Sequence, residues 1–594
     1  MAMELEGPAT TLLVVVGLLI HLAGSSPPPT PVVCARGTSD CTVTNAYGSF
    51  PDRATSRAAS VTYPSTEEEL VAAVAAAAAA GRKVKVATRY SHSLPKLACP
   101  GGRDGIIIST LQLNSTVRLD AAARMITVES GVLLRDLLRA AASAGMALPH
   151  SPYWSGVTIG GLLATGAHGS SLWGKGGAVH EYVVGLRIVT PAPASQGFAE
   201  VRELGAQHPD LGAAKVSLGV LGVVSQVTLA LQPLFKRSVT FLERDDSDLE
   251  DQVAAWGGLH EFGDLAWQPG RGKVVYRQDD RVDVSSPGNG LNDHPTLRSR
   301  AAFGRVGARR AEELLEENGT DIARCEAAAA DQLQPQPQPP HGFTNDGEVF
   351  TGYPVVGYQH RMQATGSCID SPEDELLTSC KWDPRLGATF IYNSAISVPL
   401  GNAAAFVADV KRLRDLNPRA FCSLDARGGL LACYLRASSA YLGKPEDAVD
   451  FDITYYRSYT AGAPRAHADV IDELEQMALR KYGGFPHWGK NRNFVFDGAV
   501  GRYPKAGEFL EVKGRYDPDG LFSSEWSDQV LGINRTSPRV DKEGCAMEGL
   551  CVCSGDSHCA PERGYLCRPG KVYKEARVCS SSFQPAAGAL RDEL

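Results

Sequence analysis

The 594-residue sequence carries little excess charge and few aromatic residues. Its 59 Lys and Arg residues against 67 Asp and Glu residues leave a net charge of −8, and aromatic residues make up 7%. A chain without a basic excess lacks the electrostatic footprint of a nucleic-acid-binding protein, so we expect no nucleic-acid partner. The length exceeds the ~250–300 residues at which single cores stop growing, which predicts two or more domains.

The N-terminal apolar run lacks both the length of a membrane-spanning helix and a basic residue ahead of it. The run TLLVVVGLLIHLAG, residues 11–24, is shorter than the ~20 residues a span requires. Its position is that of a signal peptide, which we assign to residues 1–25, although Glu4 and Glu6 precede the run. An uncleaved anchor is the alternative; after cleavage we expect no membrane association.

The cysteine-rich C-terminal segment, residues 540–590, lacks the paired C-x-x-C units of a zinc site, and His558 is the one histidine inside its cysteine cluster. An even number of cysteines on a secreted chain instead predicts a disulfide framework, and no metal site is expected. The cluster holds six of the 14 cysteines: Cys545, Cys551, Cys553, Cys559, Cys567 and Cys579.

Further signals agree with a secretory route. Asn114, Asn318 and Asn534 each begin an N-x-Ser/Thr glycosylation sequon. The chain ends in RDEL, residues 591–594, which differs from the retention signal KDEL at one basic residue. These features predict the lumen of the endoplasmic reticulum, with an extracellular location as the alternative.

The stretch GSSLWGKGG, residues 169–177, almost matches a phosphate-binding P-loop but lacks its hydroxyl residue. Gly176 follows Lys175 at the position where a P-loop has the Ser or Thr that binds magnesium. The flanking residues also lack the pattern of a strand before the loop and a helix after it. Upstream, glycines alternate with Val157, Ile159 and Leu162, which are too apolar for a solvated linker. Such glycine density lets a backbone approach a large flat ligand and offer its N–H groups to phosphate.

The remaining patterns predict an α+β protein. Thr66 and Glu69 have capping-box spacing ahead of an alanine-rich helix that Gly81 should end. Further helices are expected at residues 133–145 and 469–483, and strands at residues 83–87, 125–129, 185–191 and 222–231. The proline- and glutamine-rich residues 332–340 are interpreted as a surface loop.

Several ordered motifs resemble the vanillyl-alcohol oxidase (PCMH-type) family of FAD flavoproteins. VKVATRYSHS, SGVTIGGLLATGAHGSS and VSLGVLGVVSQVTLAL are similar to its FAD-binding domain, while HWGK and YDPDGLFSSEW resemble its aldonolactone oxidoreductase branch and the plant L-gulonolactone oxidase-like group. The resemblance implies an FAD-binding domain at residues 46–233 and an aldonolactone oxidase-type substrate domain at residues 234–537. The cysteine-rich tail lies outside these shared domains.

The resemblance also implies a set of cofactor contacts. His92 corresponds to the histidine that many members attach to the flavin, but Arg89 and Ser91 replace the glycines of the common motif, so covalent and noncovalent FAD both stay open. The loop of residues 169–177 should line FAD. The implied contacts fall into three groups: Thr88, Arg89, Tyr90, Ser91, His92 and Ser93 at the pyrophosphate; Ser155, Gly156, Thr158, Gly161, Gly166 and His168 beside the isoalloxazine and ribityl; and Gly219, Gly222 and Val224 through backbone.

On the substrate side the resemblance points to three residues. Lys490 of HWGK is suited to polarise an oxygen beside the flavin, and His487 should shape the pocket. Arg361 corresponds to the arginine of a Glu-x-Arg pair, with Gln359 at the glutamate position.

The implied reaction oxidises the C2 hydroxyl of an aldonolactone such as L-gulono-1,4-lactone to ascorbate or an analogue, with O2 reduced to H2O2. Because function lies in the site and not the fold, an alditol or other carbohydrate oxidase or dehydrogenase is an alternative. A glycan-binding protein acting through its cysteine-rich tail is a third interpretation.

Overall fold

The computed structural model describes residues 31–43, 53, 55–88, 95–101, 104–292, 302–317, 342–362, 391–425 and 429–582. The proposed signal peptide, the pyrophosphate segment Arg89 to Ser93, the loop at residues 332–340 and the C-terminal RDEL lie outside the described residues. Among the residues that the structure does describe, no helix is both long and apolar enough to cross a membrane.

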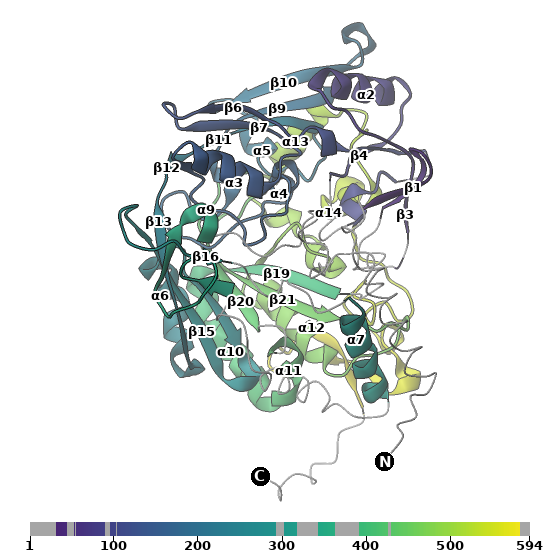
Figure 1. Cartoon of the computed structure of the whole chain (residues 1–594). Coiled ribbons are helices and arrows are strands. Elements are labelled where there is room, and N and C mark those ends of the chain that lie inside the picture. Colours follow the sequence, from purple (N-terminus) through teal and green to yellow (C-terminus); the bar gives the residue numbers. More distant parts are fainter. Residues whose placement is uncertain are drawn as a thin grey trace, which may run out of the picture.

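The N-terminal part contains two five-stranded sheets (Figure 1). Leu70, Val74 and Ala77 of helix α2 pack into one core with Val84 of the first sheet and Val189 of the second, so this helix joins the two sheets. The first sheet has the order β1 (Val32–Arg36), β2 (Ser39–Val43), β3 (Ser56–Thr62), β5 (Ile106–Ile108), β4 (Val84–Val86). The second, antiparallel sheet has the order β10 (Ala199–Gly205), β9 (Val183–Pro191), β11 (Val223–Ala230), β7 (Met125–Glu129), β6 (Thr116–Asp120).

Local sequence signals place the helices of this part. The Thr66 hydroxyl accepts a hydrogen bond from the Glu69 N–H at 3.2 Å at the start of α2 (Glu67–Ala79), and Gly81 follows its end with φ +62°. Helix α3 (Leu134–Ser143) buries Leu134, Leu137 and Leu138 at helical spacing. These elements, and the predicted strands, are confirmed.

The second part is built on an eight-stranded antiparallel sheet. On its helix-covered face, Phe451 of β21 packs against Phe406 of helix α10 (Ala403–Leu416), with ring centroids 4.8 Å apart. Helix α6 (Leu249–Leu259) packs beside α10. Helix α12 (Ala468–Gln476) forms the first part of the helix predicted at residues 469–483, which continues as a π-helix at Met477–Lys481. The strand order is β18 (Val355–Tyr358), β13 (Lys236–Asp245), β15 (Lys273–Val282), β14 (Asp264–Gln268), β20 (Leu430–Leu435), β21 (Ala448–Tyr456), β19 (Ile391–Pro399), β22 (Phe485–Pro486).

A buried network of ion pairs links the neighbouring strands β13 and β15 of this sheet. The fully buried Asp279 accepts hydrogen bonds from Arg237 Nε at 2.8 Å and from Arg277 Nε at 2.7 Å. Arg277 also lies 3.3 Å from a carboxylate oxygen of Asp264. Charges taken this far from water are stable only when they are paired, so each arginine depends on Asp279.

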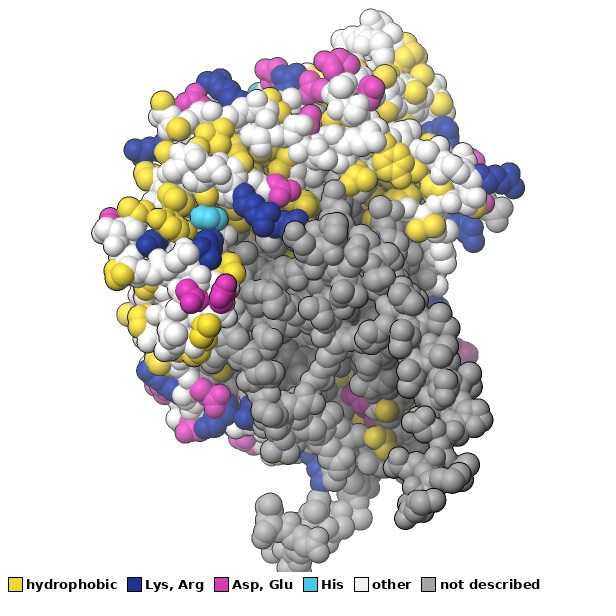
Figure 2. Space-filling model, viewed as in Figure 1, with side chains coloured by type: hydrophobic (Ala, Val, Ile, Leu, Met, Phe, Trp, Pro, Cys, Tyr) yellow, Lys and Arg dark blue, Asp and Glu magenta, His cyan; other side chains and the backbone are white. Residues whose placement is uncertain are grey.

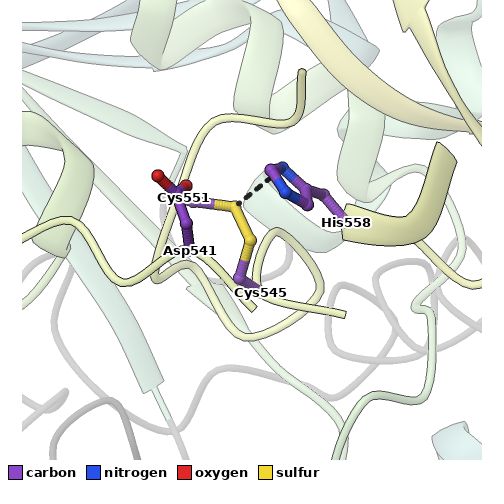
Figure 3. A group of neighbouring side chains, drawn as sticks. All are labelled: Asp541, Cys545, Cys551 and His558. Carbon is purple, nitrogen blue, oxygen red and sulfur yellow. Dashed lines mark hydrogen bonds between the residues drawn. A yellow bond between two sulfur atoms is a disulfide. The ribbon is translucent and has the colours of Figure 1, made fainter. Parts of the chain in front are cut away.

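The cysteine-rich tail is held by three disulfides, Cys545–Cys551, Cys553–Cys567 and Cys559–Cys579. It also contains a short hairpin of β23 (Tyr565–Pro569) and β24 (Arg577–Ser581). Figure 3 shows Cys545 and Cys551 bonded to each other beside Asp541 and His558. Because both sulfurs are consumed in the disulfide, neither is a thiolate ligand for a metal. The predicted disulfide framework is confirmed.

The surface is mixed in charge. On the described part of the face in Figure 2, Lys and Arg side chains alternate with Asp and Glu side chains and do not gather into a patch of one sign. This distribution agrees with the small net charge of −8.

Candidate active site

A cavity of about 430 Å³ lies where the N-terminal part meets the eight-stranded sheet. One wall comes from residues 152–168, the end of β4 and the start of β11; the other comes from β20, β21 and residues 487–490. Strand alternation turns Leu431, Cys433, Asp450 and Asp452 toward the cavity, while Val449 and its alternate neighbours pack into the core.

The glycine-rich wall suits a large flat ligand. Gly222 has φ +143°, and a Cβ there would lie 2.5 Å from the Val189 carbonyl oxygen, so only glycine fits. A Cβ on Gly160 would lie 3.0 Å from Ser130 Cβ. The buried Ser130 hydroxyl lines the cavity and has no hydrogen-bond partner among the described residues, which leaves it for a bound group. The residues present therefore fit FAD.

Most of the described residues predicted to contact FAD line this cavity. Ser155 and Gly166 do not. The Ser155 carbonyl accepts the Arg135 N–H at 3.0 Å at the start of α3, and Gly166, with φ +70°, closes the end of helix α4 (Ile159–Ala164). The predicted residues in the cavity wall are Thr88, Gly156, Thr158, Gly161, His168, Gly219, Gly222 and Val224.

The P-loop-like stretch does not line the cavity. Its Ser171 N–H donates to the Tyr434 carbonyl at 2.8 Å, and the Ser170 hydroxyl accepts from the Tyr434 N–H at 2.9 Å, so the loop is attached to β20. Lys175 lies outside, 5.9 Å from the Tyr182 ring centre. The expectation that residues 169–177 line FAD is corrected: the loop holds the two parts of the protein together.

Lys490 lies in the cavity wall formed by β20, β21 and residues 487–490, in a closed hydrogen-bond triangle. Its Nζ donates to Asn393 Oδ1 and to Asp452 Oδ2, both at 2.7 Å. Asn393 Nδ2 in turn donates to Asp452 Oδ1 at 2.8 Å. The triangle fixes the ammonium in one position, since both of its partners also hold each other.

His168 and His487 complete this side of the cavity, with ring centres 5.2 Å apart. The distance from His168 Nδ1 to the Gly169 carbonyl oxygen is 3.0 Å; because a carbonyl only accepts, Nδ1 carries the hydrogen. Burial lowers the pKa of His168, against the opposite effect of Asp450, whose carboxylate lies 3.7 Å from Nε2. The imidazole is therefore neutral, with its lone pair on Nε2.

Arg361 lies outside the cavity wall. It sits on helix α9 (Gln359–Met362) and donates to Asn289 Oδ1. Gln359 is buried and accepts a hydrogen bond from Arg237 at 3.0 Å, so it belongs to the ion network. The expected anion-stabilising role of Arg361 is not supported by its position.

Reasoning from the sequence missed Asp450, Asp452 and Cys433. The strand AVDFDITYY places Asp450 and Asp452 two residues apart in an otherwise apolar run, which is the available signal for polar side chains on one buried face. Burial, with the carboxylates of Asp264, Asp450 and Asp452, raises the pKa of Cys433, so its thiol stays protonated.

Lys85 of β4 is a buried lysine in the cavity wall, and its burial predicts a pH dependence of stability. Burial lowers its pKa from 10.5 to about 7, and its Nζ has no hydrogen-bond partner among the described residues. Between these two pH values the unfolded chain binds more protons than the folded chain, so stability rises with pH.

We expect Lys85→Met to stabilise the protein more at pH 7 than at pH 9.5, by roughly 3–5 kcal/mol at the lower pH. Thermal melts of both proteins at the two pH values measure this difference. An equal gain in stability at both pH values would contradict the lowered pKa of Lys85. The exposed Lys574→Met is the control and should show no such pH dependence.

Comparison with known proteins defines the class. Residues 58–193 match the FAD binding domain family. The fold is similar to that of a solvent-stable cholesterol oxidase, with a TM-score of 0.63 at 15% identity over 86% of this chain and 100% of the other. With the glycine-walled cavity, the matches define an FAD-dependent oxidoreductase of the PCMH-type fold, as the sequence motifs predicted.

Residues 442–530 match the D-arabinono-1,4-lactone oxidase family, and residues 542–581 match the C-terminal domain of L-gulonolactone oxidase 2-like proteins. L-gulonolactone oxidase 2 of Arabidopsis thaliana is 53% identical over 95% of each chain. L-gulonolactone oxidase of Mus musculus is 23% identical over 76% of this chain and 90% of its own. The protein belongs to the plant L-gulonolactone oxidase-like family.

Proposed function

We propose that the protein oxidises a neutral aldonolactone, L-gulono-1,4-lactone or a similar sugar lactone, at its C2 hydroxyl and reduces O2 to H2O2. The observation that carries the proposal is the Lys490, Asn393 and Asp452 triangle facing a glycine-walled FAD cavity. The names of the relatives support a lactone substrate.

FAD, when bound, supplies the hydride acceptor, and the protein supplies orientation and electrostatics. The Lys490 ammonium would stabilise the negative charge that develops on the oxygen at the reacting carbon, and the proton of the oxidised hydroxyl would pass to the lone pair of His168 Nε2 in the same cavity. The Asp450 and Asp452 carboxylates accept hydrogen bonds from the neighbouring hydroxyls of the sugar.

The charges of the site favour a neutral substrate over a sugar acid. Asp452 already compensates Lys490, and Asp450 interacts with the buried Lys444 beside a neutral His168, so both cations next to these carboxylates are already compensated. A carboxylate ligand would meet like charge in a buried site, which costs binding energy. Because Arg361 lies outside the cavity wall, it does not offset this charge.

A substrate panel tests the proposal. Purified protein is assayed for peroxide with 1,4-lactones, with the corresponding aldonates, and with alditols. We expect turnover with a lactone and at least about a tenfold lower kcat/KM with its aldonate, since Lys490 is already compensated by Asp452 and the nearby carboxylates repel the extra charge. Turnover with alditols alone would establish the carbohydrate oxidase alternative, and turnover with an artificial electron acceptor but no peroxide would establish a dehydrogenase.

We also propose that His92 carries FAD covalently and that the chain enters the secretory pathway and is retained by RDEL. Flavin that stays with acid-precipitated protein supports the covalent link, and flavin released to the supernatant refutes it. Asn114 and Asn534 are exposed and open to glycosylation. Deletion of residues 591–594 should increase secretion; unchanged secretion would refute retention.

A further inference from the structure

The cysteine-rich tail is docked on the substrate part and is not a separate module. The buried Glu473 of α12 accepts hydrogen bonds from three successive backbone N–H groups of the tail, Lys571, Val572 and Tyr573, at 2.6 to 2.7 Å. Gln476 bonds to both backbone groups of Arg577. These bonds attach the tail to the helix that packs behind the active-site strands.

The disulfide-closed loop of residues 545–551 reaches further, to β19. Glu548 is buried and accepts hydrogen bonds from Arg457 at 3.0 Å and from the Gly462 N–H at 2.7 Å, which anchors the loop. The Met547 carbonyl accepts the Tyr392 hydroxyl at 3.4 Å. Gly549 packs so closely that a Cβ there would lie 2.8 Å from Arg492 Nη1.

Tyr392 and Arg492 form a platform directly behind the Lys490 triangle. The Arg492 guanidinium lies 4.1 Å from the Tyr392 ring centre and donates to Asp472 and Glu475 at 2.6 and 2.7 Å. Arg492 is 3% exposed, so the platform is enclosed between the tail and α12.

The platform is one residue away from the groups that hold the lysine. Asn393 follows Tyr392 on β19, and Asn491 precedes Arg492. Asn491 Oδ1 accepts the Asn393 N–H at 2.7 Å, and the Asn491 N–H donates to the Asn393 carbonyl at 3.1 Å. Asn393 then accepts from Lys490 Nζ. A continuous chain of contacts thus joins the tail to the lysine.

We propose that the loop of residues 545–551 is a positioning element of the active site: it presses the Tyr392–Arg492 platform into the one arrangement that aims Lys490 at the substrate. Gly549 is its critical residue, since only a glycine lets the loop backbone reach the platform. The inference rests on the proposed function where it is tested by kcat, whereas its test by hydrogen exchange of β19 does not depend on that function.

The test compares Gly549→Ala with Gly544→Ala, a tail glycine with the same left-handed backbone (φ +66° against +68°) whose Cβ would meet no atom closer than 3.8 Å. We expect Gly549→Ala to keep its FAD spectrum and to lose roughly 10-fold to 10²-fold in kcat, because small misplacement of a catalytic group is that costly. Hydrogen exchange of residues 391–399 should accelerate in this variant. Gly544→Ala, which carries the same backbone strain without the contact, should match the parent protein in FAD spectrum, kcat and hydrogen exchange.

A double-mutant cycle separates positioning from a general structural effect. If the loop acts through Lys490, Gly549→Ala causes no further loss of kcat in a Lys490→Met background. An additional loss there, or unchanged exchange and kcat in the single variant, would overturn the inference. Should Gly549→Ala not fold, Tyr392→Phe, which removes only the hydroxyl bonded to Met547, should show a smaller change in the same direction.

The two proposals fail in different ways. A parent protein that turns over no lactone refutes the proposed function, while exchange at residues 391–399 still tests the contact between tail and β19. An active parent with an unaffected Gly549→Ala variant refutes only the positioning role.

Discussion

Lys490→Met is expected to lose about 10²–10³-fold in kcat/KM with the best lactone while it keeps its FAD. The Lys490 ammonium lines the cavity and donates hydrogen bonds to Asn393 and Asp452. A methionine side chain has nearly the same length but cannot donate a hydrogen bond. The glycine-rich wall comes from other segments, residues 152–168 and the start of β11, so flavin content should not change.

Peroxide assays with a lactone and the absorption spectrum of the purified variant measure both effects. Lys175→Met is the matched control, because Lys175 is exposed and lies outside the cavity wall. Full turnover in Lys490→Met would remove this residue from the mechanism. Loss of flavin together with activity would show that the lysine supports the fold of the cofactor site instead.

Asp279→Ala should lower the free energy of unfolding by about 3–5 kcal/mol, because it leaves two buried arginines without their shared carboxylate. Arg237 and Arg277 are 1% and 4% exposed, so neither can recover its hydration without disrupting the sheet. The effect should extend to the cavity, since Arg277 also contacts Asp264, to which the Tyr153 hydroxyl donates a hydrogen bond.

Urea or thermal unfolding compares this variant with Asp245→Ala. Asp245 ends the neighbouring strand β13 and pairs with Lys273 of β15 at 2.8 Å, but its side chain is 76% exposed, and such surface pairs contribute about 1 kcal/mol or less. Similar free energies of unfolding for the two variants would contradict the stabilisation that we attribute to the buried ion network.

The sequence predicted elements whose signals are local. The helix after Thr66 is defined by a cap, alanine propensity and a glycine stop within a single segment, and the structure confirms it. The glycines near Gly160 line the cavity as expected, because the absence of a side chain acts wherever the backbone runs close to a ligand. Lys490 and His487 likewise lie at the cavity, where their motif placed them.

Predictions that depended on distant pairing were less successful. Arg361 was assigned from a short motif, but its helix lies where the side chain reaches Asn289. Loop 169–177 has the composition of a ligand-binding loop, yet its backbone groups are taken by β20, far along the chain. Nothing within either segment specifies these partners.

By itself, the sequence predicted the α+β class and the glycine-rich wall from local patterns, and the cofactor and the lysine through motifs that resemble a known family; each of these signals lies in residues that are close together along the chain. Only the tertiary structure decided how that lysine is held. Its two partners, Asp452 and Asn393, are 38 and 97 residues away in the sequence. They meet because β19 pairs with β21 in a register that sets Asn393 opposite Thr454 and Ala395 opposite Asp452. Strand register is fixed by packing across the whole sheet, so the local periodicity of the sequence does not predict it.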